Sequence, residues 1–297
     1  MAFRVIGFLF LMLMDGGVAV LPGLSSDRCQ VMGILNVTPD SFSDGGRYIQ
    51  LRDAVEQGLR LVAEGADVID VGGESTRPGA TPVSVMEEID RVVPVIAALS
   101  KAVSVPISVD TSKPEVMRLA VAAGACMIND VRALRLPGAL EAAAALGVPV
   151  CLMHMQGEPA TMQCNAHYKS DVVGEVMAFL AQQLAACRAA GLDEQKLMID
   201  PGFGFGKELP HNLSLLASLD RLKTLNRPIL VGVSRKSMLG QILGQRPAPG
   251  RQTASVTAAL WAAVHGAAMV RVHDVAPTVD ALRVWQALAA VRARAEP

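Results

Sequence analysis

The sequence is poor in the residues that build covalent or metal cross-links. Its five cysteines among 297 residues are an odd number, lie far apart and include no CxxC pair: Cys29, Cys126, Cys151, Cys164 and Cys187. A chain of this length can bury roughly three-quarters of its unfolded surface, so it needs no disulfide or structural metal to hold it together. We therefore interpret the cysteines as small core residues of a protein in a reducing compartment. This interpretation excludes a disulfide framework and a cysteine zinc site.

The sequence also lacks an excess of positive charge. Lysine and arginine number 27 and aspartate and glutamate 28, which leaves a formal net charge of −1. This balance excludes nucleic-acid binding driven by bulk charge, although a local basic site remains possible. With 19% charged and 51% hydrophobic residues, the composition is that of a folded globular protein and not of a disordered one.

No apolar run is long enough to span a bilayer. The nearest candidate, residues 8–14, is too short. It follows Arg4 as the core of a signal peptide would, but no convincing cleavage site comes after it, so secretion is the less favoured interpretation. Residues 1–24 are then either a segment that closes the bottom of the domain or residues added by an upstream start codon. We expect a cytoplasmic protein without a membrane segment.

Eight short apolar runs rich in β-branched residues alternate with longer stretches of helical periodicity. The runs occupy residues 31–35, 68–71, 106–109, 126–128, 148–153, 196–199, 228–233 and 268–272. The helical stretches occupy residues 51–64, 84–99, 114–123, 139–146, 172–190, 213–222, 253–264 and 279–292. Strands that alternate with crossover helices pair in parallel, and eight such units within roughly 265 residues favour a single (β/α)₈ TIM barrel over an open doubly wound sheet. We expect an N-terminal extension over residues 1–27 and one barrel domain over residues 28–297.

A polar residue lies at or just after the end of every apolar run: Asn36, Asp70, Asp110, Asn129, His154, Asp200, Ser234, and the pair Arg271 and His273. In a parallel barrel the carboxyl ends of all strands meet at one mouth, where active sites are built. Any one of these residues could be a turn former or a helix cap, because Asn and Asp favour both positions. Eight in succession are hard to explain by capping alone. Arg271 and His273 are two residues apart, so both side chains should leave the same face of the last strand.

The loops after the strands carry groups that bind anions and flat rings. Residues 36–46 are rich in turn formers, hydroxyls and acids, which suits a mobile lid around an anion or a hydrated Mg²⁺. Residues 72–79 combine small residues, hydroxyls and one arginine for a phosphate-like group. Residues 200–207 alternate glycine and phenylalanine beside a carboxylate, which suggests a flat platform and not a dinucleotide fingerprint. The loops after strands 7 and 8, residues 234–237 and 271–274, commonly bind phosphate in such barrels.

These residues predict a pocket for a ligand that carries both a flat ring and a phosphate-type group. The anion site would comprise Arg77, Arg235, Lys236, Arg271 and His273. Asn36 offers a possible metal site, and the carboxylates of Asp110 and Asp200 could accept from N–H donors on the ring. No Gly-x-Ser-x-Gly elbow and no loop cysteine with a paired histidine is present. This favours chemistry without a covalent enzyme intermediate, in which an anionic leaving group is neutralised as it departs.

At these loops the sequence resembles the dihydropteroate synthases, the folate-pathway enzymes that sulfonamides inhibit. The resemblance rests on eight segments in family order: residues 32–46, 70–79, 108–111, 128–130, 153–155, 200–207, 234–237 and 271–274. The first two segments, MGILNVTPDSFSDGG and DVGGESTRPG, are long enough to make a chance match negligible. The stretch before Cys29 lies outside the family's motifs and puts only the start site in question.

The resemblance implies a transferase that joins para-aminobenzoate to (7,8-dihydropterin-6-yl)methyl diphosphate, forming 7,8-dihydropteroate and releasing pyrophosphate. In this family the diphosphate leaves first, and Mg²⁺ is the cofactor. The implied catalytic residues are Asp110, Lys236, Arg271 and His273, and the implied Mg²⁺ ligand is Asn36. The implied substrate-binding residues are Thr76, Arg77, Asp110, Asn129, Met153, Asp200, Phe205, Gly232, Ser234, Lys236, Arg271 and His273.

The resemblance also implies a role for each group. Asp200 would accept two adjacent N–H bonds of the pterin, and Arg271 would lie across the ring face. Asp110 would stabilise the cationic methylene left when the diphosphate departs. The remaining pterin contacts would come from Asn129, Asp110, Lys236, Met153 and Phe205, and the diphosphate contacts from Asn36, Thr76, Arg271 and His273. The aminobenzoate pocket would comprise Thr76, Arg77, Pro78 and Ser234.

Three alternatives differ in kind from this interpretation. A pterin-dependent methyltransferase of the same superfamily would keep the pterin pocket but would need neither the first loop nor residues 234–237, and both are present. A catalytically idle pterin-binding paralogue should have lost loop residues, and none is missing. A barrel used only for interaction leaves the cluster at the strand ends unexplained. The family further implies a homodimer, small-molecule substrates, sulfonamides as competitive ligands, and no nucleic-acid or membrane partner.

Overall fold

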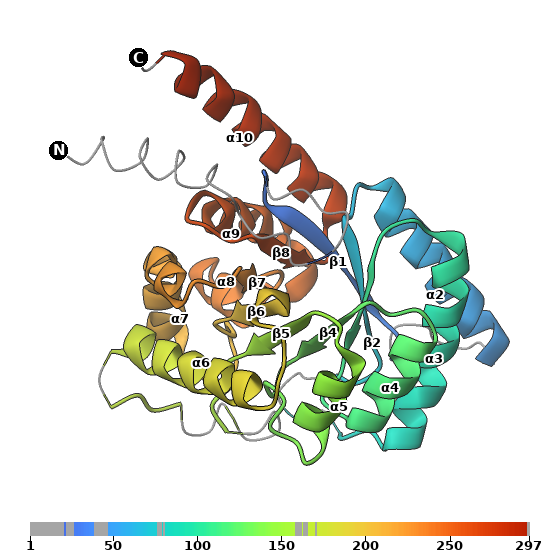
Figure 1. Ribbon diagram of the computed structural model, residues 1–297. Helices are drawn as coiled ribbons and strands as arrows, with labels where there is room; N and C mark the ends of the chain where they lie inside the picture. Colours follow the sequence, from blue (N-terminus) through green and yellow to red (C-terminus); the bar gives the residue numbers. More distant parts are fainter. Residues whose placement is uncertain are drawn as a thin grey trace.

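The chain folds as a barrel of eight parallel strands (Figure 1). The computed structural model describes residues 21, 27–38, 47–75, 79, 81–157, 162, 166–169 and 171–295. The strands are β1 (Gln30–Asn36), β2 (Val68–Gly72), β3 (Ile107–Asp110), β4 (Met127–Asp130), β5 (Val150–Met153), β6 (Leu197–Asp200), β7 (Leu230–Val231) and β8 (Met269–Val272). They are paired in the order β6-β5-β4-β3-β2-β1-β8-β7. A parallel bridge between Ile199 and Ile229 joins the two ends and closes the barrel.

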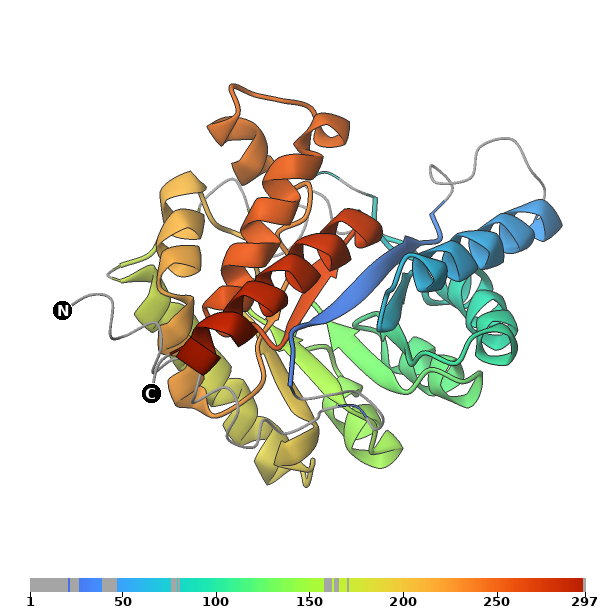
Figure 2. The ribbon, with the colours of Figure 1, turned by 90° about the horizontal axis from the view of Figure 1, so that it is seen from above.

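Helices surround the strands on the outside (Figures 1 and 2). They are α2 (Arg47–Ala63), α3 (Val85–Ala102), α4 (Pro114–Ala122), α5 (Ala139–Leu146), α6 (Val172–Ala189), α7 (Leu209–Ala217), α8 (Ser237–Ile242), α9 (Gln252–Val264) and α10 (Val275–Ala295). Short 3₁₀ turns are η2 (Glu194–Lys196), η3 (Leu219–Leu225) and η4 (Ala248–Arg251). The predicted (β/α)₈ TIM barrel is confirmed, and so is the placement of the strand carboxyl ends at a common mouth.

Two helical segments differ from the prediction. A single helix over residues 213–222 is wrong, because α7 ends at Ala217 and Ser218 leaves the helical conformation with φ −113° and ψ 25° before η3 begins. Leucines are buried on both sides of this break, so the apolar periodicity runs through it. Helix α8 was not predicted, since six residues are too few to show a helical period.

The lower interior of the barrel is an apolar layer. Its buried side chains come from the first half of nearly every strand and form one cluster: Met32, Val68, Met127, Cys151, Met198, Leu230 and Met269. Leu21 packs into the same cluster with only 1% of its surface exposed. Since the strands begin at this end, Leu21 lies at the bottom of the barrel; the rest of residues 1–26 lies outside the described residues.

The cysteines within the described residues behave as core side chains. Cys151 and Cys187 are buried, Cys29 and Cys126 are partly buried, and all four are free thiols. Burial raises the pKa of Cys29 to about 12, which keeps its thiol protonated and unreactive. Cys164 lies outside the described residues. No helix in the described part of the chain has the length and apolar character needed to cross a membrane.

Candidate active site

Arg271 stands at the centre of the barrel mouth between two carboxylates. Its Nε donates to Asp70 Oδ2 at 2.6 Å, and its Nη2 donates to Asp110 Oδ2 at 2.8 Å. Asn129 Nδ2 donates to the same Asp70 oxygen at 3.0 Å. Burial opposes the charge on Arg271, but the two carboxylates raise its pKa above the usual value. Strands β2, β3, β4 and β8 thus place one permanent cation in a frame of acceptors.

Asp200, at the end of β6, holds the other side of the mouth. Its Oδ1 accepts from Gly202 N at 2.7 Å, which fixes the rotamer of the carboxylate. The side chain is only 5% exposed. Burial raises the pKa of Asp200, while the ammonium of Lys236 acts to lower it. The carboxylate is therefore destabilised as an anion and favours a partner that donates hydrogen bonds.

Lys236 lies over the glycine-phenylalanine loop between β6 and α7. Its Nζ donates to the carbonyl oxygen of Phe203 and lies 4.4 Å from the centroid of the Phe205 ring. Burial lowers the pKa of Lys236 to about 8, although Asp200 acts in the opposite direction. Gly204, between the two phenylalanines, has φ +80°, a conformation that a side chain would strain. The loop therefore does form a ledge beside the carboxylate of Asp200.

An apolar wall adjoins this ledge. Met153, at the end of β5, is 3% exposed and forms a cluster with Val131, Met155 and Met162, against which Phe205 packs. On the remaining side, Gly232 follows β7 and leaves open space. A Cβ built there would lie 3.9 Å from both Arg271 Cβ and Asp200 Oδ2. The mouth thus combines an apolar wall with acids and cations.

Asp110, at the end of β3, has a strongly perturbed carboxyl group. Burial raises its pKa from an ordinary value of 3.8 to about 7, against the lowering effect of Arg271. Repulsion from Asp70 and Glu88 adds to the increase. Near neutral pH the group is therefore poised between its neutral and charged forms, which is common for residues that act on a charged reaction centre.

Ser234 and His273 meet at the end of β8. Ser234 Oγ accepts from His273 N at 3.1 Å and lies 3.0 Å from His273 Nδ1. Arg235, which the sequence analysis placed in the anion site, is different. Its Nε and Nη2 donate to the carboxylate of Asp274 at 3.0 and 2.6 Å. Its charge is therefore already paired with a carboxylate of the loop after β8. Arg235 itself has a φ of 57°, in the left-handed region.

A buried lysine-histidine pair supports the ledge and was not predicted. Lys207 Nζ donates to the carbonyl oxygens of Gly202 and Phe205 at 2.8 and 3.1 Å and lies 2.8 Å from His154 Nδ1. Burial lowers the pKa of Lys207 well below its usual range. Burial and the nearby ammonium lower the pKa of His154 to about 2, so the imidazole is neutral. The sequence signal that could have found Lys207 is the three glycines before it, Gly202, Gly204 and Gly206, because a loop of repeated glycines turns its carbonyls and favours a shared donor.

Asn36 ends β1 and is the candidate metal ligand. It lies two positions after Ile34 and four after the interior Met32, so its side chain is on the inward face of the strand. Its side chain is partly exposed and makes no hydrogen bond to another described residue. No group of three or more His, Cys, Asp or Glu residues that could hold a metal occurs among the described residues. A single amide oxygen suits Mg²⁺, which usually keeps several waters and binds chiefly through substrate phosphates.

Part of the predicted site lies outside the described residues. These are Thr76, Arg77 and Pro78 in the loop after β2, and residues 39–46 in the loop after β1. The residues that the structure brings together at the mouth are Asp110, Asn129, Met153, Asp200, Phe205, Gly232, Lys236 and Arg271, with Ser234 and His273 paired beside them. Asp70 and Lys207 join them as buried supports.

Comparisons with known proteins agree with this geometry. Residues 32–273 match the family described as "Pterin binding enzyme". The chain is 56% identical over 257 residues to dihydropteroate synthase of Escherichia coli K12, covering 86% of this chain and 90% of the relative. A structure of Xanthomonas albilineans dihydropteroate synthase in complex with 7,8-dihydropteroate matches with a TM-score of 0.82 and 54% identity over 89% of this chain and 95% of that one. A Yersinia pestis dihydropteroate synthase with a sulfonamide drug complex matches with a TM-score of 0.85 and 52% identity over 90% and 96% of the chains.

Proposed function

The chain belongs to the dihydropteroate synthases of the pterin-binding enzyme family, and we propose how the side chains at its barrel mouth carry out the condensation of that family. The observation that carries the proposal is the convergence of Asp200, Asn129, Asp110 and Lys236 around Arg271 inside the mouth. The reaction joins para-aminobenzoate to the methylene carbon of the dihydropterin diphosphate and releases pyrophosphate.

The pterin would bind first, with its ring against the ledge. Asp200 has one oxygen held by Gly202 N, and its carboxylate would accept from the adjacent ring and exocyclic N–H groups. Lys236, which has donors beyond the one used by Phe203, would donate to ring acceptors. Asn129 and Asp110 would complete the polar contacts. Met153 and Phe205 provide the apolar wall, and the guanidinium of Arg271 would lie across the ring face.

The diphosphate would then leave with the electron pair of the C–O bond. His273 and Arg271 would hold the departing anion from the protein side. Asn36 would be the protein ligand of a Mg²⁺ ion, whose contribution when bound is to neutralise charge on the diphosphate oxygens. Asp110, which pairs with Arg271, would in its charged form stabilise the cationic methylene that remains. Because the pKa of Asp110 is about 7, part of the carboxyl is protonated at neutral pH. A positive charge on the methylene would lower this pKa and favour the ionised form.

The amine of para-aminobenzoate would attack the methylene carbon and lose one proton to form dihydropteroate. Its carboxylate would be held by the loop after β2 through Thr76, Arg77 and Pro78, together with Ser234. Sulfonamides resemble aminobenzoate and would compete for the same loop. We propose further that the protein works as a homodimer without a nucleic-acid partner, as the family resemblance implies.

The rival interpretations predict different results in one assay. A pterin-dependent methyltransferase would not consume para-aminobenzoate, and an idle paralogue would bind pterin without turnover. The complete set of loop segments and the 56% identity to a dihydropteroate synthase favour the synthase.

The test is a product assay. Purified protein is mixed with the dihydropterin diphosphate and labelled para-aminobenzoate, with Mg²⁺ or with a chelator. The expected result is Mg²⁺-dependent labelled dihydropteroate in a one-to-one ratio with pyrophosphate. Pterin binding without product would place the protein among the idle paralogues. Turnover that persists without any divalent metal would contradict the role given to Asn36.

A further inference from the structure

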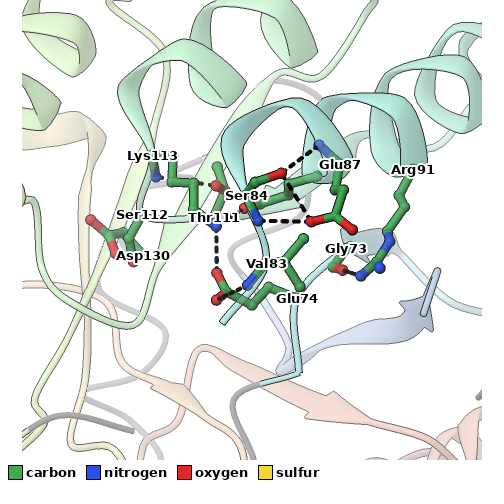
Figure 3. A network of polar contacts seen from close by, with 11 residues as sticks. Gly73, Glu74, Val83, Ser84, Glu87, Arg91, Thr111, Ser112, Lys113 and Asp130 are labelled. Carbon is green, nitrogen blue, oxygen red and sulfur yellow. Dashed lines mark hydrogen bonds and ion pairs between the residues drawn. The ribbon is translucent and has the colours of Figure 1, made fainter. Parts of the chain in front are cut away.

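A second polar cluster lies beside the mouth, between the loops that follow β2 and β3 (Figure 3). At its centre is Lys113, three residues after Asp110 and directly before the first residue of α4. Its Nζ donates to Glu74 Oε2 at 2.7 Å and to Glu88 Oε2. The lysine side chain is 16% exposed and that of Glu88 0%. Neither the sequence motifs nor the proposed chemistry assigns these residues a role.

Glu74 fastens the two ends of the loop between β2 and α3. It is the second residue of that loop. Its Oε1 accepts a hydrogen bond of 3.2 Å from the backbone N–H of Val83, which lies at the far end of the loop. Its other oxygen is the one held by Lys113. The base of the loop is fixed independently, because Arg91 Nη1 donates to Gly73 O at 2.9 Å. Figure 3 shows Glu74 between Val83 and the loop that carries Lys113.

The helix behind this loop is also anchored at its start. Ser84 and Glu87 form a capping box at the N-terminus of α3, in which Ser84 N donates to Glu87 Oε2 at 3.1 Å. Close packing leaves no freedom at the base, since a Cβ on Gly73 would lie 2.7 Å from Val92 Cγ1. Glu74 therefore links the fixed start of this loop to Val83 at its far end and to Lys113 in the neighbouring loop.

Charge explains why a lysine is needed at this point. One ammonium faces two carboxylates, and Glu88 Oε1 is buried without a hydrogen-bond partner in the described part of the chain. Burial alone would lower the pKa of Lys113, but the bonds from Glu74 and Glu88 raise it, so the lysine stays charged. A neutral residue here would leave Glu88 as an unpaired buried charge and would release Glu74.

We propose that Lys113 is a positioning residue for the aminobenzoate subsite: by holding Glu74 against Glu88, it fixes the loop after β2 relative to the strand that carries Asp110. The inference rests on the proposed function, which gives residues 76–78 of this loop to aminobenzoate. The pterin side of the mouth is held by Arg271, Asn129 and Gly202, and among the described residues Lys113 makes no hydrogen bond to any of them. Glu88 acts on Asp110 only through charge repulsion. Loss of Lys113 should therefore weaken the second substrate and spare the first.

The test compares steady-state constants for both substrates across a set of variants. Lys113→Met combined with Glu88→Gln removes the tether without leaving an unpaired buried charge, so it separates positioning from folding. We expect the KM for para-aminobenzoate and the Kd of a sulfonamide to rise about tenfold, because small misplacements of a binding loop have effects of this size. The KM for the pterin diphosphate should stay within about twofold of the parent value. Lys113→Arg should restore most of the aminobenzoate affinity.

A matched control is Lys196→Met at the opposite end of the barrel. Lys196 Nζ donates to the carbonyl oxygen of Gly147 at 2.8 Å, so this variant also removes a lysine that fixes a loop. It should change neither KM. Equal increases in both KM values in the Lys113 double variant, or no change in the KM for aminobenzoate, would overturn the positioning role. A parent protein that makes no dihydropteroate would instead refute the proposed function, and the inference with it.

Discussion

The bottom and the mouth of this barrel are built from the same strands, but the bottom is lined by apolar side chains and the mouth by polar ones. Two residues along a strand separate an apolar interior side chain from a polar or open position: Val68 from Asp70, Met127 from Asn129, Met198 from Asp200, Leu230 from Gly232, and Met269 from Arg271. The lower layer packs hydrophobically, with Leu21 pressed against it. The upper layer holds carboxylates under an arginine. The period of two in a strand places both layers inside the barrel.

The two layers differ in what they contribute: the lower layer stabilises the fold, and the upper layer supplies the polar groups of the candidate site. Burial of the lower layer removes apolar surface from water, which favours folding. The upper layer opposes folding in part: Asp70 Oδ1 is buried without a hydrogen-bond partner in the described residues, and burial raises the pKa of Asp110 and Asp200. Unsatisfied and strongly perturbed groups of this kind are common at functional sites.

The largest expected effect is on pterin binding, from a substitution in the upper layer of β6. Asp200→Asn keeps the shape of the side chain and an oxygen for Gly202 N but places an NH₂ group opposite the N–H donors of the pterin. Charged hydrogen bonds contribute ~1.5–3 kcal/mol each, so losing two should weaken pterin binding about 10²–10⁴-fold. The melting temperature should stay the same or rise, because a buried charge is removed. Calorimetric titration with a pterin and a thermal melt measure the two quantities.

Met198→Ala, two residues lower on the same strand, should have the opposite pattern: it should reduce stability and leave substrate binding unchanged. Truncating a buried methionine costs ~2–5 kcal/mol of unfolding free energy. The side chain is 1% exposed and does not reach the mouth, so both KM values should be unchanged at a temperature where the protein is folded. If Asp200→Asn collapses the fold, or Met198→Ala abolishes pterin binding, the division between layers is wrong.

A second, smaller effect is the pH dependence of the upper layer. Turnover should need Asp110 charged and Lys236 protonated. Their pKa values of about 7 and about 8 predict that kcat/KM for the pterin diphosphate rises as pH passes 7 and falls as it passes 8. In Asp110→Asn the rising limb should be lost together with most of the activity. An unshifted acid limb in that variant would show that another group titrates.

Folding stability should change in the opposite direction to activity as Asp110 loses its proton. Because the folded pKa of Asp110 lies above its ordinary value of 3.8, the folded protein binds more protons between about pH 4 and 7. The contribution of Asp110 to stability is therefore lost as pH rises through this range. Denaturant melts of the parent and of Asp110→Asn should converge at low pH and diverge toward pH 7, where the variant is the more stable. A divergence of the opposite sign would contradict the burial effect.

Much of the fold and of the mouth could be predicted from the sequence, because both follow from local pattern. Eight apolar runs alternating with helical stretches specify the barrel, and their final residues specify the inward polar ring. Asp110, Asn129, Asp200 and Arg271 were found in this way. Those predictions needed only the period of the strand and the parallel direction shared by all eight.

The rest depends on contacts between loops that no local pattern reports. Arg235 reads as an anion-binding residue beside Lys236, yet Asp274, 39 positions away, neutralises it. Lys113 pairs with Glu74 at the same sequence separation and was not singled out at all. The break at Ser218 is invisible because buried leucines continue past it. Which charged residue meets which is decided by the tertiary arrangement, after the strands have been placed.

The smallest expected effect concerns the open position above Leu230. A Cβ on Gly232 would have no heavy atom within 3.9 Å other than those of Arg271 and Asp200 at that distance, so the folded protein can accept alanine. Gly232→Ala should leave the melting temperature unchanged or raise it, since a compatible Gly→Ala change stabilises by ~0.4–1 kcal/mol. If the space belongs to the pterin, the methyl group should raise the KM for the pterin diphosphate by about 3–30-fold through overpacking. Leu230→Ala, two residues below, should instead lower the melting temperature and leave that KM alone. An unchanged KM in Gly232→Ala would move the pterin away from β7 and confine it to the ledge beside Lys236 and Phe205.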